Sequence, residues 1–244
     1  MASIIDHNGI ERKLGLIPLD EATRNLAASK PSFGDYLAEN NLPLYTVNDW
    51  EEVDPEFGDE FVLDQHQTSG CVGFSEAAAE MKIRALRGMP FERLSGAFSY
   101  SWVNGGRDEG AQIIAARNAA EIHGHALESE FNLPHIYTNQ IPDAVIESSL
   151  ERKSRISYRI DTREQMATAI MLGFVVQRGI FVGRNFNSIN DDGVVGYSPG
   201  YANHSIHTFG MKRIRGVWRW KDGNTWGLNF ALRGNFYSEM QSAI

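Results

Sequence analysis

The chain has 244 residues, a formal net charge of −8 and a pI near 5.4. An acidic chain whose Lys and Arg residues form no basic stripe disfavours a nucleic-acid binder. Hydrophobic residues make up 42% and charged residues 22%, the balance of a globular protein with a real core, and the length allows one large domain or two lobes that share a cleft.

Cys71 is the single cysteine, so no disulfide can form within the chain, which favours a reducing compartment. The first residues lack the basic and apolar regions of a signal peptide. No apolar run approaches the ~18 residues of a membrane span. We therefore expect a chain that acts in the cytoplasm or inside a particle assembled within a cell, without membrane contact.

Residues 1–45 are predicted to form an N-terminal extension, either a plug for a cleft or a docking arm for an assembly partner. Two short helices are expected in it, over 19–28 after Pro18, and over 32–39 with Ser32 as the cap. The stretch 42–64 is acidic and extended.

The strongest helix signal begins at Cys71 and runs through helix-forming residues to a stop at Gly88 and Pro90. Its apolar positions recur at three- and four-residue steps, which predicts a deeply buried face. Further helices are predicted over 109–123, with Ala111, Ile114, Ala115, Ala119 and Ile122 inward, and over 162–172.

After these helices the pattern changes to short β-prone runs between Gly, Asn and Asp turns. These runs cover 174–176, 180–182, 206–209, 217–220, 230–232 and 236–237. A helical half followed by a β-rich half predicts an α+β fold, with a helical lobe over 46–150 and a β-rich lobe over 151–244. A cleft between two lobes is a natural binding site.

Cys71 opens the strongest helix, behind Gly70. Unpaired amides and the positive end of the helix dipole at such a position stabilise a thiolate over a thiol. A lone cysteine is more often a small buried hydrophobe, but this position favours a reactive one.

The segment around Cys71 resembles the active-site segment of the papain family of cysteine peptidases, with Gln65 six residues before the nucleophile. His204 and Asn224 follow 133 and 153 residues later, near the family's spacing for its His and Asn. Further motifs of the resemblance are Asn104-Gly105-Gly106, Asn203-His204, Asn224-Thr225-Trp226-Gly227 and, near the start, Asp49-Trp50.

The resemblance covers about residues 45–240 and implies a papain-like two-lobe fold, with a β-barrel-like second lobe and the active site in the cleft. It implies Cys71 as nucleophile, His204 as base, Asn224 as the group that orients the imidazole, and Gln65 as an oxyanion donor. It places substrate-binding residues at Gly105, Gly106, Asn203, Trp226 and Phe230.

The sequence also departs from the family. Val72 replaces the Trp that usually follows the nucleophile, the structural disulfides are absent, and the extension is too short for the long inhibitory pro-segment. The usual zymogen mechanism is therefore not expected.

The predicted function is that of a cysteine-type endopeptidase that acts on proteins or peptides through a thioester acyl-enzyme, without cofactor or metal. His66 is a weaker candidate for the base, and a metal site at His204 and His207 is disfavoured because residues three apart on a strand point to opposite faces. Two alternatives stay open: a non-catalytic module on the same scaffold, for example in a viral particle, and a cell-wall amidase or transamidase.

Overall fold

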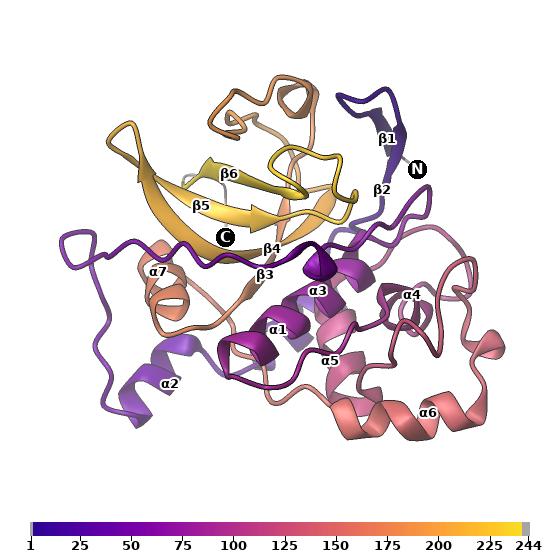
Figure 1. Cartoon of the computed structure of the whole chain (residues 1–244). Helices are drawn as coiled ribbons and strands as arrows, with labels where there is room; N and C mark the ends of the chain where they lie inside the picture. Colours follow the sequence, from indigo (N-terminus) through magenta and orange to yellow (C-terminus); the bar gives the residue numbers. More distant parts are fainter. Residues whose placement is uncertain (1, 241–244) are drawn as a thin grey trace.

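The computed structural model describes residues 2–240. These residues form a helical lobe, a lobe built on a β-sheet, and an N-terminal arm that contacts both (Figure 1). In this part of the chain, no helix has the length and hydropathy needed to cross a membrane.

The arm begins with a hairpin of β1 (Ala2–Ile5) and β2 (Glu11–Leu14), which pair antiparallel. The sequence analysis did not predict this hairpin. Two helices follow, α1 (Glu21–Ser29) and α2 (Phe33–Glu39). Asp20 caps α1 by accepting a hydrogen bond from the Thr23 N–H at 2.8 Å. The predicted helices of the arm are thus confirmed to within two residues.

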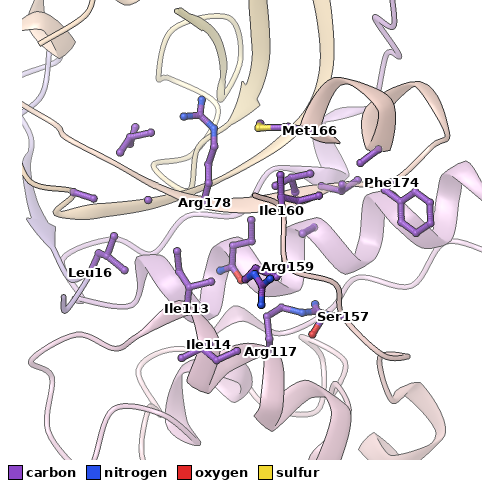
Figure 2. Close-up of a pocket in the computed structure, with 18 of the residues that line it drawn as sticks. Leu16, Ile113, Ile114, Arg117, Ser157, Arg159, Ile160, Met166, Phe174 and Arg178 are labelled. Carbon is purple, nitrogen blue, oxygen red and sulfur yellow. The ribbon is translucent and has the colours of Figure 1, made fainter. Parts of the chain in front are cut away.

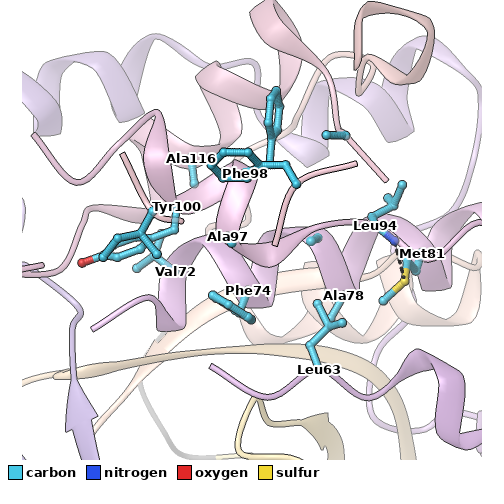
Figure 3. Packing of buried hydrophobic residues seen from close by; sticks show 14 of the residues in the cluster. Leu63, Val72, Phe74, Ala78, Met81, Leu94, Ala97, Phe98, Tyr100 and Ala116 are labelled. Atoms are coloured by element: carbon cyan, nitrogen blue, oxygen red, sulfur yellow. Dashed lines mark hydrogen bonds between the residues drawn. The ribbon is translucent and has the colours of Figure 1, made fainter. Parts of the chain in front are cut away.

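The helical lobe is centred on α3 (Cys71–Leu86), as predicted. The remaining helices of this lobe are η1 (Asp59–Phe61), α4 (Gly96–Ser101), α5 (Ile113–His123), η2 (Thr138–Gln140), α6 (Asp143–Ser149) and η3 (Leu150–Arg152). Figure 3 shows Phe74, Ala78 and Met81 of α3 packed among side chains of this lobe. Gly73 permits the close approach of α4, because a Cβ there would lie 2.4 Å from the backbone nitrogen of Tyr100.

Two predictions for this lobe were wrong in detail. The helix predicted from residue 109 begins at Ile113, and Ile122, predicted inward, is 58% exposed. The short helix α4 was missed because Gly, Ser and aromatic residues are weak helix formers. Tertiary packing, which buries all six of its residues, makes up for that weak propensity.

The second lobe carries one antiparallel sheet in the order β3 (Val176–Ile180), β4 (His204–Ile214), β5 (Val217–Gly223), β6 (Asn235–Glu239), with α7 (Arg163–Met171) and the short η4 (Arg184–Asn187). The sheet does not close into a barrel. The strand predicted over 230–232 does not form; Ala231 has a φ of 44°, which belongs to a turn.

The two lobes meet where α3 packs against β4. At this interface the buried Lys82 Nζ lies 3.0 Å from His207 Nε2 and 4.8 Å from the centre of the Phe209 ring. Burial, together with the charge of Lys221, lowers the pKa of Lys82 to about 7. Between about pH 7 and the ordinary Lys pKa of 10.5, the unfolded chain binds a proton that the folded chain releases, so this group makes stability rise with pH.

Lys82→Met is therefore expected to raise the free energy of unfolding at pH 7 by about 1–4 kcal/mol, because it removes a buried charge. The difference from the parent chain should shrink as the pH approaches 10. Urea unfolding at several pH values measures this. The control is Lys153→Met, at an exposed lysine, which should change stability by less than ~0.5 kcal/mol. A Lys82→Met chain less stable than the parent at pH 7 would contradict the assignment.

Candidate active site

His204 and Asn224 form one buried hydrogen-bonded pair. His204 is the first residue of β4 and Asn224 directly follows β5, so the antiparallel pairing of these strands brings them together. His204 Nε2 donates to Asn224 Oδ1 at 2.8 Å. The proton on Nε2 leaves Nδ1 with a free lone pair, and Nδ1 has no hydrogen-bond partner in the part of the chain that the structure describes. The ring is thus oriented as a base.

Cys71 is the first residue of α3 and is fully buried. The backbone N–H of Ser205, which directly follows His204, donates to its sulfur. Gln177 links the same two elements: its Nε2 donates to Val72 O at 2.8 Å and to Ser205 Oγ at 3.2 Å. The start of α3, with Cys71, and the start of β4, with His204, are therefore held together across the lobe interface.

Gln65 is buried, and both the oxygen and the nitrogen of its side-chain amide are hydrogen-bonded. Its Oε1 accepts from Thr225 Oγ1 at 2.7 Å, and its Nε2 donates to Thr68 O at 2.8 Å. The same Nε2 also donates to the carbonyl oxygen of Lys13, at 3.3 Å. A carbonyl of the N-terminal arm thus occupies the amide donor that the sequence analysis assigned to an oxyanion.

The arm continues through the site as an extended strand. The backbone N–H of Gly15 donates to the sulfur of Cys71. Three backbone hydrogen bonds hold the segment: from Leu16 N–H to Asn203 O at 3.2 Å, from Ala111 N–H to Gly15 O at 2.8 Å, and from Ile17 N–H to Ala111 O at 2.9 Å. The Leu16 side chain lies over Gly179, where a Cβ would come within 2.6 Å of Leu16 Cδ2.

Contacts made by Arg12 and Lys13 anchor the arm just before the segment that covers Cys71. The buried Arg12 donates to Asp6 at 3.0 Å, to Asp64 at 2.9 Å and to the carbonyl oxygen of Trp226 at 2.8 Å. Lys13 forms an ion pair with Asp108 of the helical lobe at 3.0 Å. The arm therefore binds both lobes, and it covers the thiol between them.

Burial beneath the arm reverses the protonation states expected for Cys71 and His204. Burial raises the pKa of the Cys71 thiol to about 11, against the opposing hydrogen bonds from Ser205 and Gly15. Burial also lowers the pKa of His204 to about 4, although the hydrogen bond to Asn224 acts in the other direction. At neutral pH both groups are uncharged. The prediction of a thiolate from the helix dipole is wrong for this closed form, because the free energy cost of burying a charge exceeds the stabilisation that the dipole provides.

Aromatic rings enclose the histidine. The centre of the Trp226 ring lies 5.0 Å from that of His204, and Phe230 packs edge-on to Trp226 at 5.0 Å. Both aromatic residues are fully buried. On its other side Phe230 meets His7 of the arm at 5.5 Å. Trp226 and Phe230 thus lie where the arm and the second lobe meet, and Asn203, also predicted to bind substrate, contacts the arm directly.

Gly105 and Gly106 do not take part in these contacts. Both are exposed, have positive φ, and a Cβ on either would meet nothing within 4 Å. The wall that pairs with the arm is Gly110-Ala111 instead, and a Cβ on Gly110 would lie 2.2 Å from Gly15 O. The roles of Gly105 and Gly106 in substrate binding therefore stay predictions, and the segment that pairs with the arm lies five residues later. The sequence signal that could have found it is Gly110 directly before the apolar face of α5.

The rival residues lie elsewhere. The His66 side chain is 68% exposed, with Nδ1 3.8 Å from Asp64 Oδ2. His207 contacts Lys82, while His204 contacts Asn224, so the two rings have separate partners. Among residues 2–240, no three His, Cys, Asp or Glu side chains gather in a way that could hold a metal ion.

A scan against protein-family models and a sequence search of curated proteins both found no match. Solved structures do match. Xylellain, a cysteine protease from Xylella fastidiosa, has a TM-score of 0.71 and 18% identity over 94% of this chain and 91% of that one. For procathepsin B S9 from Trypanosoma congolense the TM-score is 0.61 and the identity 14%, over 93% and 80%. For the bromelain protease from Ananas comosus, solved with the E64 inhibitor, they are 0.57 and 18%, over 73% and 83%.

Proposed function

We propose that this chain, which has the divergent papain-like fold that its sequence predicts, is a cysteine-type endopeptidase. The observation that carries the proposal is the His204–Asn224 hydrogen bond of 2.8 Å, which leaves Nδ1 as a free base, while the N–H of the next residue, Ser205, donates to the buried thiol of Cys71.

The proposed reaction needs an uncovered site. His204 Nδ1 takes the proton of the Cys71 thiol, and the resulting thiolate attacks the carbonyl carbon of a peptide bond. Gln65 Nε2 and the backbone N–H of Cys71 donate to the oxyanion. The C–N bond then breaks, His204 returns the proton to the leaving amine, and a thioester stays on Cys71. Water, deprotonated by the same imidazole, hydrolyses that thioester.

The bound arm supports a polypeptide substrate over a cell-wall fragment. Gly15 and Leu16 lie in the cleft in extended form, and they are held by backbone hydrogen bonds to Ala111 and Asn203. Such bonds recognise the main chain of any extended peptide, as in strand addition to a sheet edge. A cleft that binds one peptide segment in this way is suited to bind another.

The arm itself is proposed to act as a plug. It covers the thiol, fills the donor of Gln65 with the Lys13 carbonyl, and holds Cys71 and His204 uncharged. Turnover therefore requires that residues 13–17 leave the cleft. Water can then reach the site and stabilise the thiolate–imidazolium pair.

Asn224→Ala tests the proposed role of the histidine. The substitution removes the acceptor that fixes the imidazole, so kcat should fall roughly 10- to 100-fold, as for the loss of one hydrogen bond to a group that becomes charged. KM should change little, because Asn224 does not touch the substrate. The assay uses a chain whose arm has been released from the cleft, such as Gly15→Ala. Hydrolysis of a denatured protein measures its activity, and the circular dichroism spectrum measures its folding.

The matched control is Asn25→Ala, at an exposed position of α1. This variant should keep full activity. An Asn224→Ala chain that is folded and fully active would refute the proposed arrangement.

The complete burial of the thiol also fits the alternative of a non-catalytic module. The two functions differ in what happens when the arm is released. A peptidase thiol then reacts with the epoxide inhibitor E-64 and turns over peptide, whereas a structural cysteine does neither.

A further inference from the structure

A groove of about 1000 Å³ runs between the two lobes along α3. Figure 2 shows it following α3, with Arg178 and Ile160 on the side of the sheet lobe, Ile113 and Arg117 of α5 on the other side, and Leu16 and Phe174 at opposite ends. Neither Cys71 nor His204 is among the described residues that line it. Leu16 and Gln177 line the groove and also contact residues next to Cys71 and His204, so the groove adjoins the site of the proposed chemistry.

The groove is mainly apolar although it is open to solvent. Its wall contains several of the exposed large hydrophobic side chains of the described chain, among them Ile17, Met89, Ile156, Tyr197 and Tyr201. The exposed fractions are 59% for Ile156 and 93% for Tyr201. Exposed apolar side chains gathered around one depression mark a binding site more often than scattered ones do.

The charge of the groove is opposite to that of the chain. Of the charged residues in residues 2–240 that line it, eight are Lys or Arg and three are Glu, whereas the whole chain has a net charge of −8. Most of these cations have carboxylate partners, such as Arg117 with Glu76. Three exposed cations of the groove form no ion pair within the described part of the chain. One is Arg87, which lies over the ring of Phe174, 5.9 Å from its centre. The other two are Lys153 and Arg155. They are two residues apart, so an extended backbone directs both to one face.

We propose that the groove binds a long-chain fatty acid, with its carboxylate at Lys153 and Arg155 and its acyl chain along the apolar wall toward Phe174. The basic pair complements a single anionic head group, and the wall complements a hydrocarbon chain. Each further methylene that leaves water should raise the affinity about fourfold, so chain length matters. Ligands that are polar throughout would leave the apolar wall unused.

A ligand in the groove would also contact the arm. Leu16, Pro18 and Ala27 belong to the arm and line the groove. A bound acyl chain therefore contacts the same segment that crosses Cys71. This contact gives the ligand a direct means of stabilising the closed arm.

The test is oleate binding to the full chain, measured by displacement of the fluorescent fatty acid cis-parinaric acid below the micelle concentration. This readout does not depend on peptidase activity, so it stands apart from the proposed function. Oleate should bind at least 100-fold more tightly than octanoate, which has ten fewer carbons, and at least tenfold more tightly than uncharged methyl oleate.

The double variant Lys153→Glu with Arg155→Glu should weaken oleate binding at least tenfold. The matched control carries the same charge reversal at two exposed arginines outside the groove, Arg107→Glu with Arg215→Glu, and should bind oleate as the parent chain does. The proposal is overturned if oleate does not displace the probe, if octanoate or methyl oleate binds equally well, or if both double variants behave alike. Displacement by inorganic phosphate or by an acidic peptide but not by oleate would also overturn it.

Discussion

Gly15→Ala is expected to open the active site and to accelerate both E-64 labelling and peptide hydrolysis at least tenfold. A Cβ at residue 15 would lie 1.8 Å from the backbone oxygen of Ser69, a distance that no side chain can occupy. Because the obstacle is backbone, it cannot turn away. Either the arm must leave the cleft or the loop before Cys71 must move, and both changes disturb the closed form.

The release should also change the thiol. Once water reaches Cys71, the desolvation that raises its pKa to about 11 is removed, and the helix terminus and His204 should lower the pKa. Thiolate absorbance near 240 nm, measured against pH and corrected with the Cys71→Ala chain, should appear at lower pH in Gly15→Ala than in the parent. The control Gly196→Ala adds a Cβ that meets nothing within 4 Å, so it should leave the labelling rate unchanged. Equal labelling of Gly15→Ala and the parent would mean that the arm does not limit access.

Cys71→Ala, introduced into the Gly15→Ala chain, is expected to reduce peptide hydrolysis by roughly 10⁴-fold or more. Loss of a nucleophile removes the covalent route altogether and leaves only the small acceleration that binding and the oxyanion donors supply. The chain should still fold, although the backbone N–H groups of Ser205 and Gly15 lose the sulfur as their acceptor. E-64 should no longer attach to the protein.

Hydrolysis of a denatured protein and mass spectrometry of the E-64 adduct measure these two effects. The matched control is Ser75→Ala, one turn further along α3, where the buried hydroxyl has no hydrogen-bond partner among residues 2–240. Ser75→Ala in the same background should retain activity. Continued hydrolysis by the Cys71→Ala chain, after repurification to exclude a contaminant, would rule out Cys71 as the nucleophile.

Local sequence determined those elements whose cause is local. The helix from Cys71 was predicted because helix-forming residues fill it and Gly88 and Pro90 end it. The cap Ser32 was predicted from the same kind of signal. The α+β order of the chain and its papain-like fold also followed from the sequence. The roles of Gln65, Cys71, His204 and Asn224 come from a resemblance carried by residue type and spacing, and they stay predictions.

The tertiary structure decided everything that depends on groups distant in sequence. Gly105 and Gly106 matched a motif, yet the arm pairs with Ala111, because backbone pairing depends on where the chain folds and not only on which residues it contains. The charge state of Cys71 was mispredicted for the same reason. A helix terminus is a local feature that favours a thiolate, but the segment that removes water from it lies more than fifty residues earlier. Desolvation is set by what covers a group, and only the folded arrangement of the arm determines that.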